Sequence, residues 1–178
     1  VGGPLPAAVA VVNPNRDDDL SGKGHLCAAG VVFLALVRTA STLRARGHAV
    51  PPPDLLSLLD LVALATVCDV VPLTGLNRAL VAQGLKVLGW RNNIGLRALC
   101  DVAKIDEPAG TYHLGFLLGP RVNAGGRVGR ADLGTRLLST GDTTEAAALA
   151  AELDRFNIER KLIEQQVQDE ALAQVERH

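Results

Sequence analysis

Asp69 is the first residue in the sequence whose type and setting suggest chemistry, because it is a lone carboxylate near the end of a long apolar run. Residues 60–73 read DLVALATVCDVVPL, and nearly all of them are Leu, Val or Ala. An ionised carboxylate in such surroundings must be paired, hydrogen-bonded or bound to a metal. One interpretation is a turn aspartate that accepts hydrogen bonds from backbone amides before Pro72. The other is a ligand for Mg²⁺ or Mn²⁺, which prefer carboxylate oxygens.

The second candidate is the stretch of residues 119–130, which reads GPRVNAGGRVGR and contains no acid. Glycines allow a backbone to approach a ligand closely. Exposed amides and guanidinium groups together suit phosphate oxygens. The stretch, which contains Arg121, Asn123, Arg127 and Arg130, therefore predicts a loop that could bind phosphate.

A structural alternative remains open for these arginines, which could instead pair with acids of a following helix such as Glu152 or Asp154. The glycines do not have the GxGxxG spacing of a dinucleotide-binding turn. The four histidines show no metal-ligand spacing to one another, and no serine lies in a nucleophile elbow.

The elements that must position these residues are mostly helices. Residues 7–12 (AAVAVV) predict one short buried strand, because a Val-rich run lies between turn residues. Asp54 and Asn77 are typical helix caps, and residues 113–118 predict a turn of helix or a strand that leads into Gly119. Apolar periodicity predicts helices at residues 26–46, 54–69, 77–88, 93–102 and about 132–138.

The last predicted element is one long helix over residues 142–178. Asp142 and Glu145 form a capping-box pattern, and neither Gly nor Pro occurs after Asp142. At ~1.5 Å per residue the helix would be roughly 50 Å long. Its apolar stripe is narrow, so we expect it to pack along one domain and then leave it as a spacer.

Composition limits the remaining possibilities. The chain has 178 residues, 48% apolar and 3% aromatic, with a net charge of −1, which predicts a globular core of Leu, Val and Ala and no general attraction to polyanions. Three widely spaced cysteines match neither a zinc nor a disulfide pattern and predict reduced thiols in a cytoplasmic protein. No signal-peptide pattern is present. Because the chain lacks Met and opens on Val1, we expect an internal piece of a longer protein.

Three segments resemble the RecJ-type single-strand-specific 5′→3′ DNA exonucleases of the DHH phosphoesterase superfamily. They are LPAAVAVVNPNR with LCAAGVVF, DLVALATVCDVVPLTGLNRALVAQGLKVL, and LGFLLGPRVNAGGR. They occur in the family's order and cover essentially the whole chain. The family often has Gly at the position of Ala65 and Ala at that of Cys68, and both differences are small.

The resemblance implies an α/β fold class. Residues 1–141 would be the C-terminal, mostly helical part of a DHH-type catalytic domain with one short N-terminal strand. Residues 142–178 would be the long connecting helix that leads to a DHH-associated domain. The Asp-His-His triplet and the earlier acidic motifs of the family are not in this sequence.

The resemblance also implies a function in DNA repair and recombination, with phosphodiester hydrolysis at a two-metal Mn²⁺ or Mg²⁺ site. Asp69 would be a metal ligand and catalytic residue, most other ligands would lie outside the chain, and the chain alone would be inactive. Arg121, Asn123 and Arg127 would face DNA phosphates. The implied partners are single-stranded DNA and a single-strand-binding protein, with no membrane.

Two other functions remain open at this point. One is another DHH-type phosphodiesterase, acting on cyclic dinucleotides or short oligonucleotides. The other is a non-catalytic helical interaction module, which predicts no dependence on divalent metals and no preference for single strands.

Overall fold

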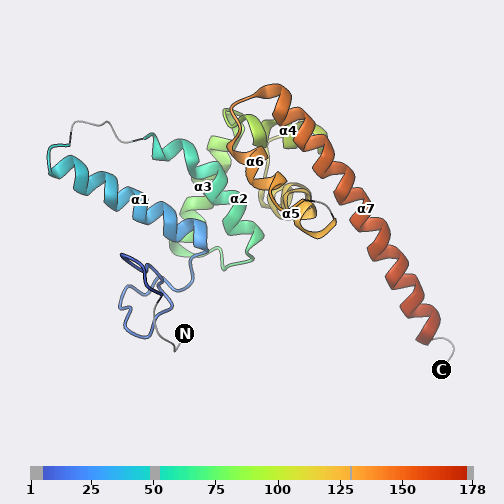
Figure 1. The fold of residues 1–178 in the computed structure, drawn as a ribbon, viewed down its shortest axis with the longest axis horizontal. Coiled ribbons are helices and arrows are strands. Elements are labelled where there is room, and N and C mark those ends of the chain that lie inside the picture. Colours follow the sequence, from blue (N-terminus) through green and yellow to red (C-terminus); the bar gives the residue numbers. More distant parts are fainter. Residues whose placement is uncertain (1–5, 49–52, 129, 176–178) are drawn as a thin grey trace. The chain divides into compact units, whose positions relative to one another are not determined.

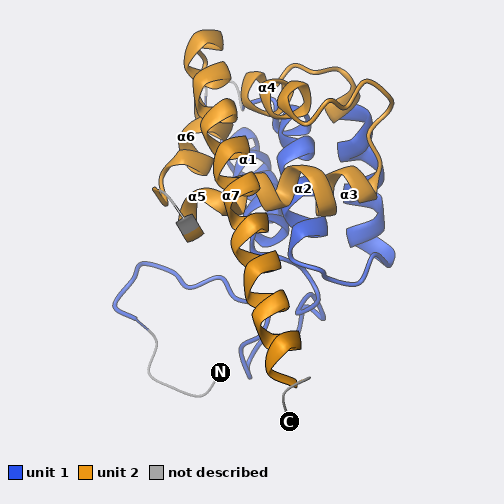
Figure 2. Ribbon diagram, turned by 90° about the vertical axis from the view of Figure 1, so that its right-hand side faces the viewer, with its two compact units in different colours: residues 1–87 blue, residues 88–178 orange. Residues whose placement is uncertain are grey.

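The structure, a computed structural model, describes residues 6–48, 53–128 and 130–175. These residues form two compact units, residues 1–87 and 88–178 (Figure 2). The α-helices, labelled in Figure 1, are α1 (Ala28–Ala45), α2 (Leu59–Cys68), α3 (Gly75–Gly89), α4 (Ile94–Val102), α5 (Gly119–Val128), α6 (Leu133–Ser139) and α7 (Thr143–Val175). A 3₁₀ turn, η1 (Leu55–Leu58), precedes α2, and a π-helix, η2 (His113–Leu118), precedes α5. The expectation of a mostly helical protein is therefore confirmed.

The strand expected at residues 7–12 is not formed in the structure. This segment consists of bends and irregular backbone, and its side chains are mostly exposed; Val9 and Val12 are 109% and 68% exposed. A strand needs a neighbouring strand to satisfy its backbone hydrogen bonds. The described residues contain no strand with which this segment could pair.

Helices α1, α2 and α3 enclose the core of the first unit. Phe33, Leu59, Val62, Leu80 and Val87 pack together there. A methyl group at Gly84 would lie 2.1 Å from the carbonyl oxygen of Leu59, so glycine is what allows α3 to pack directly on α2.

By length and composition alone, α1 is the single described helix that could cross a membrane. This is a weak indication, because core helices of water-soluble proteins pass the same test.

The carboxylate that is buried in the first unit is Asp60 in the first turn of α2, and not Asp69. Asp60 is 2% exposed and accepts a hydrogen bond of 2.7 Å from the amide of Leu61. Burial raises the pKa of Asp60 above its ordinary value, and the bond from Leu61 only partly offsets this. The folded state therefore binds this proton more tightly than the unfolded chain does, so the charge costs stability at neutral pH.

We expect Asp60→Asn to raise the free energy of unfolding at pH 7 by on the order of 1 kcal/mol. The gain should shrink as the pH falls through the raised pKa of Asp60 and vanish below the ordinary Asp pKa, where both states are protonated. Urea unfolding of both proteins between pH 4 and pH 8 measures this. A gain that stays constant over that range would show that Asp60 does not carry a buried charge.

The core of the second unit is built on leucines. Leu96, Leu99, Leu114, Leu118, Leu133, Leu137 and Leu153 are the largest apolar side chains that are less than 2% exposed. The amide of Leu96 donates to Asn93 Oδ1 at 2.9 Å, which caps α4 as the sequence predicts. A methyl group at Gly95 would lie 1.9 Å from the carbonyl oxygen of Leu137. The lack of a side chain at Gly95 therefore allows the backbones of α4 and α6 to pack in direct contact.

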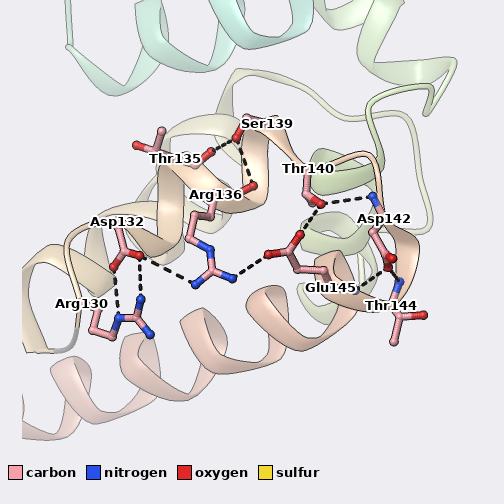
Figure 3. A network of polar contacts seen from close by, with 9 residues as sticks. All are labelled: Arg130, Asp132, Thr135, Arg136, Ser139, Thr140, Asp142, Thr144 and Glu145. Atoms are coloured by element: carbon pink, nitrogen blue, oxygen red, sulfur yellow. Dashed lines mark hydrogen bonds and ion pairs between the residues drawn. The ribbon is translucent and has the colours of Figure 1, made fainter.

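Helix α7 begins as the sequence predicts. Asp142 Oδ1 accepts hydrogen bonds from the amides of Thr144 and Glu145, at 2.7 and 2.9 Å. The second half of the expected capping box differs, because the Glu145 side chain accepts from Thr140 Oγ1 at 2.6 Å and pairs with Arg136 (Figure 3). Both contacts lower the pKa of Glu145, and the hydrogen bond from Thr140 has the larger effect.

The apolar stripe of α7 is buried only in the first half of the helix. Leu149, Leu153 and Phe156 are buried against α4, α5 and α6, whereas Ile163 and Val167 are 50% and 60% exposed. After Arg160 the side chains of α7 are almost all exposed. The last three residues of the predicted helix, 176–178, lie outside the described residues.

Candidate functional site

Asp69 directly follows α2 and forms its C-terminal cap. Its amide donates to the carbonyl oxygen of Ala65 at 2.9 Å, and its side chain is exposed. The carboxylate makes no hydrogen bond or ion pair with the described residues. The expectation of a carboxylate in apolar surroundings is therefore wrong, since Asp69 is exposed and the next residue, Val70, is 86% exposed.

Two features of the backbone at Asp69 are locally unfavourable. A negative charge at the C-terminus of a helix opposes the helix dipole, at a typical cost of about 0.3–1 kcal/mol. The next residue, Val70, has a φ of 55°, although β-branched side chains rarely adopt this left-handed region. Such strain persists where the surrounding structure requires it, and it is most frequent at functional sites.

Asn77 holds the segment that follows Asp69 in place. Its side chain is 0% exposed, and Nδ2 donates to the carbonyl oxygens of Pro72 at 3.0 Å and of His25 at 2.9 Å. Asn77 is thus the third residue of α3 and not its cap, which corrects the expectation that it begins the helix. Two segments far apart in sequence, the DVVPL turn and the residues before α1, are tied together by this single amide.

We expect Asn77→Ala to lower the free energy of unfolding by about 2 kcal/mol, because two buried carbonyl oxygens lose their donor. Asn92, which is exposed and has no hydrogen bond within the described residues, offers a matched control as Asn92→Ala. Urea unfolding of both variants measures the difference. Equal losses in the two variants would show that the bonds of Asn77 to Pro72 and His25 contribute nothing.

The described residues contain no group of three or more His, Cys, Asp or Glu side chains that could hold a metal ion. Asp69 is nevertheless suited to supply one ligand, because both of its oxygens are free of other contacts within the described residues. A two-metal site needs several carboxylates that bridge the ions. Asp69 alone could contribute only one part of such a site.

The segment from residue 119 onward is a helix and not the loop that its glycines predict. α5 uses the amides of this segment in helical hydrogen bonds, so they are not available to cradle a phosphate. The glycines instead allow close packing. A methyl group at Gly125 would lie 3.0 Å from Leu153 Cδ2 on α7, and one at Gly134 would lie 3.0 Å from Val122. Gly129 lies outside the described residues.

Arg121 is directed toward α7. Its Nε donates to Asp154 Oδ1 at 2.8 Å and its Nη1 to the carbonyl oxygen of Leu117 at 2.7 Å. The Arg121 side chain is 13% exposed and that of Asp154 is 26% exposed. This is the ion pair to the long helix that the structural alternative predicted. Arg121 could contact a phosphate only through the guanidinium N–H groups that these bonds leave unused.

Asn123 and Arg127 lie one helical turn apart on the opposite, exposed face of α5. Neither side chain makes a hydrogen bond or ion pair with other residues that the structure describes. Of the candidate phosphate-binding residues, these two are therefore free to meet a ligand. Asp69 belongs to the first unit and α5 to the second.

Arg130, the last arginine of the predicted loop, is occupied by a local network. Its Nη2 lies 2.7 Å from Asp132 Oδ2, and Arg136 connects Asp132 to Glu145 (Figure 3). The Arg130 guanidinium lowers the pKa of Asp132, and Glu145 raises the pKa of Arg136. This network joins the start of α6 to the start of α7. Arg127 is therefore the exposed arginine of the segment that has no ion-pair partner among the described residues.

Sequence reasoning missed the bridging role of Asn77 and the burial of Asp60. The local pattern of Asn77 predicts a helix cap, whereas its bonds to Pro72 and His25 depend on the tertiary structure. The burial of Asp60 had one signal in the sequence. Asp60 is a charged residue at the start of the apolar run of α2, where its neighbours are core residues.

No protein-family model matches the chain. Curated relatives are similar over nearly its whole length. The single-stranded-DNA-specific exonuclease RecJ of Salmonella typhimurium is 43% identical over 96% of this chain and 31% of its own length. RecJ of Escherichia coli is 43% identical over 99% and 32%, and RecJ of Thermus thermophilus is 37% identical over 98% and 24%. The chain thus spans about a quarter to a third of the length of these relatives.

Solved structures give the same result. An exonuclease RecJ bound to manganese matches with a TM-score of 0.81 and 37% identity, over 98% of this chain and 42% of that one. RecJ of Thermus thermophilus in complex with Mn²⁺ matches with a TM-score of 0.67 and 36% identity, over 79% and 21%. Over nearly its whole length, the chain is therefore similar to a part of the RecJ exonucleases.

Proposed function

We propose that this chain contributes part of the catalytic region of a single-strand-specific 5′→3′ DNA exonuclease that acts in DNA repair and recombination. The main support is the match of 98% of the chain to an exonuclease RecJ bound to manganese, with a TM-score of 0.81. The substrate would be single-stranded DNA, and a single-strand-binding protein would be a partner. The site of action would be the cytoplasm.

Asp69 would supply one carboxylate ligand of a Mn²⁺ or Mg²⁺ site. Its carboxylate, which is exposed and has no ion-pair partner among the described residues, and the strained Val70 beside it support this role. The metal ions would polarise the phosphate and supply the attacking hydroxide. The other ligands would come from sequence outside this chain, so the chain alone would be inactive.

The exposed face of α5 would hold the DNA backbone. Arg127 and Asn123 are suited to phosphate oxygens because neither has another partner in the described residues. Arg121 would act mainly by fixing α5 on α7 and could offer its remaining N–H groups to a phosphate.

The domain organisation follows the same proposal. Residues 1–141 would form the C-terminal part of a DHH-type α/β catalytic domain. Residues 142–178 would be the helix that connects it to a further domain, which is supported by the exposed second half of α7. Residues 7–12 would become a strand where a neighbouring strand of the complete domain is available to pair with them.

The experiment that tests the proposed function is hydrolysis by the full-length protein with Mn²⁺. A 5′-labelled single strand, the same sequence as a blunt duplex, and a cyclic dinucleotide would be compared. Release of nucleotides from the single strand alone is expected. Hydrolysis of the cyclic dinucleotide in preference to the single strand would overturn the proposal.

A further inference from the structure

Tyr112 and Phe116 form an exposed aromatic pair in a protein that has very few aromatic residues. Their rings are stacked, with centroids 5.2 Å apart and an interplanar angle of 25°. Tyr112 is 61% exposed and Phe116 is 67% exposed. Large apolar rings are costly to leave in water, and aromatic side chains that stay exposed in pairs are typical of binding surfaces.

The pair is held rigidly by the helix on which it lies. Residues 111–128 are continuously helical through η2 and α5. On the buried side, Leu114 and Leu118 are 0% exposed. The start of this helix is fixed by His113, whose Nδ1 accepts from the amide of Gly110 at 3.0 Å and whose Nε2 lies 3.1 Å from Glu107. The π-turn of η2 is a feature that occurs most often at functional sites.

The aromatic pair shares its exposed face with the phosphate-binding candidates. Tyr112, Phe116, Asn123 and Arg127 follow one another at intervals of four, seven and four residues, which is helical spacing, and all four are exposed. Residues 111–128 contain no Asp or Glu. From Tyr112 to Arg127 the helix rises by about 22 Å, enough for several nucleotides.

We propose that this 112–127 face, defined by Tyr112, Phe116, Asn123 and Arg127, is a binding surface for single-stranded DNA on which unpaired bases stack against the two rings. Arg127 and Asn123 hold the backbone farther along the helix. Aromatic rings next to cations are the combination by which proteins bind single strands without reading sequence. A paired base in a duplex does not offer its face to a ring, so this surface favours single strands. The inference rests on the proposed function, because the DNA substrate comes from there.

The test compares two DNA strands of equal length in the presence of EDTA, which prevents hydrolysis. One strand carries ordinary bases and the other has abasic sites at alternate positions. In the full-length protein, Tyr112→Leu with Phe116→Leu keeps apolar side chains but removes the rings. We expect the double variant to bind the ordinary strand about 10- to 100-fold more weakly. Its affinity for the abasic strand should be nearly unchanged.

Trp90→Leu is the matched control, because Trp90 is 63% exposed but lies outside the 112–127 face. It should bind both strands like the wild type. If the double variant loses the same affinity for both strands, or loses none for either, the stacking role is overturned. An equal loss of affinity together with a lowered melting temperature would show that the rings serve protein packing instead. If the wild-type protein itself fails to bind the ordinary strand, the proposed function fails with it.

Discussion

Replacement of Asp69 by asparagine in the full-length protein is expected to lower the rate of Mn²⁺-dependent hydrolysis by about 100-fold or more, because the proposed metal ligand loses its charge. Asparagine has nearly the same size, and the Asp69 side chain makes no hydrogen bond or ion pair with the residues that the structure describes. Removal of a negative charge from a helix C-terminus should raise the free energy of unfolding slightly, by about 0.3–1 kcal/mol. A loss of activity without a loss of stability is thus the expected signature.

Asp106→Asn provides the control for Asp69→Asn. Asp106 is also exposed, and it has no hydrogen bond or ion pair in the described part of the chain. Its replacement should change neither the hydrolysis rate nor the stability. Near-normal turnover in Asp69→Asn, at saturating Mn²⁺, would remove Asp69 from the proposed metal site.

The two arginines of α5 are expected to respond in opposite ways to replacement by alanine. Arg121→Ala leaves Asp154 without its partner and removes the bond to the carbonyl oxygen of Leu117, so we expect a loss of about 2–3 kcal/mol in the free energy of unfolding. Arg127→Ala should leave stability unchanged, since the side chain has no partner among the described residues. Binding should report on Arg127 instead.

Single-strand affinity measured against salt concentration separates the two roles. Loss of one phosphate contact should reduce the slope of log K against log[salt] by roughly 0.7. We expect this reduction in Arg127→Ala and a much smaller one in Arg121→Ala, with melting temperature measured in parallel. An unchanged slope in Arg127→Ala would contradict its contact with DNA, and an unchanged melting temperature in Arg121→Ala would contradict the structural role of its ion pair.

The helices were predictable from local signals in the sequence. Asp54 and Asp142 cap their helices through bonds to amides two and three residues ahead, and such bonds depend only on nearby residues. The apolar spacing of α7 likewise predicted which of its residues are buried as far as Phe156. The residue after which the apolar stripe becomes exposed could not be predicted, because its burial depends on which other helices pack against α7.

The errors came from interactions between residues far apart in sequence. A strand at residues 7–12 requires a partner strand that local pattern does not reveal. The glycines of α5 predicted a loop by their intrinsic preference, but Gly125 is buried against α7, and tertiary packing overrides propensity. The apolar run around Asp69 predicted apolar surroundings, but the run leaves the core where α2 ends, so that both Asp69 and Val70 are exposed.

The assignment of Asp69 as a metal ligand is tested most directly by the binding of Mn²⁺ to the full-length protein, without substrate. Titration followed by electron paramagnetic resonance counts the free ion and so gives the number of bound ions and their affinity. We expect two Mn²⁺ ions per wild-type chain, and in Asp69→Asn either one ion fewer or an affinity about 10-fold or more lower for at least one of them. The same number of ions with the same affinities in both proteins would contradict the assignment.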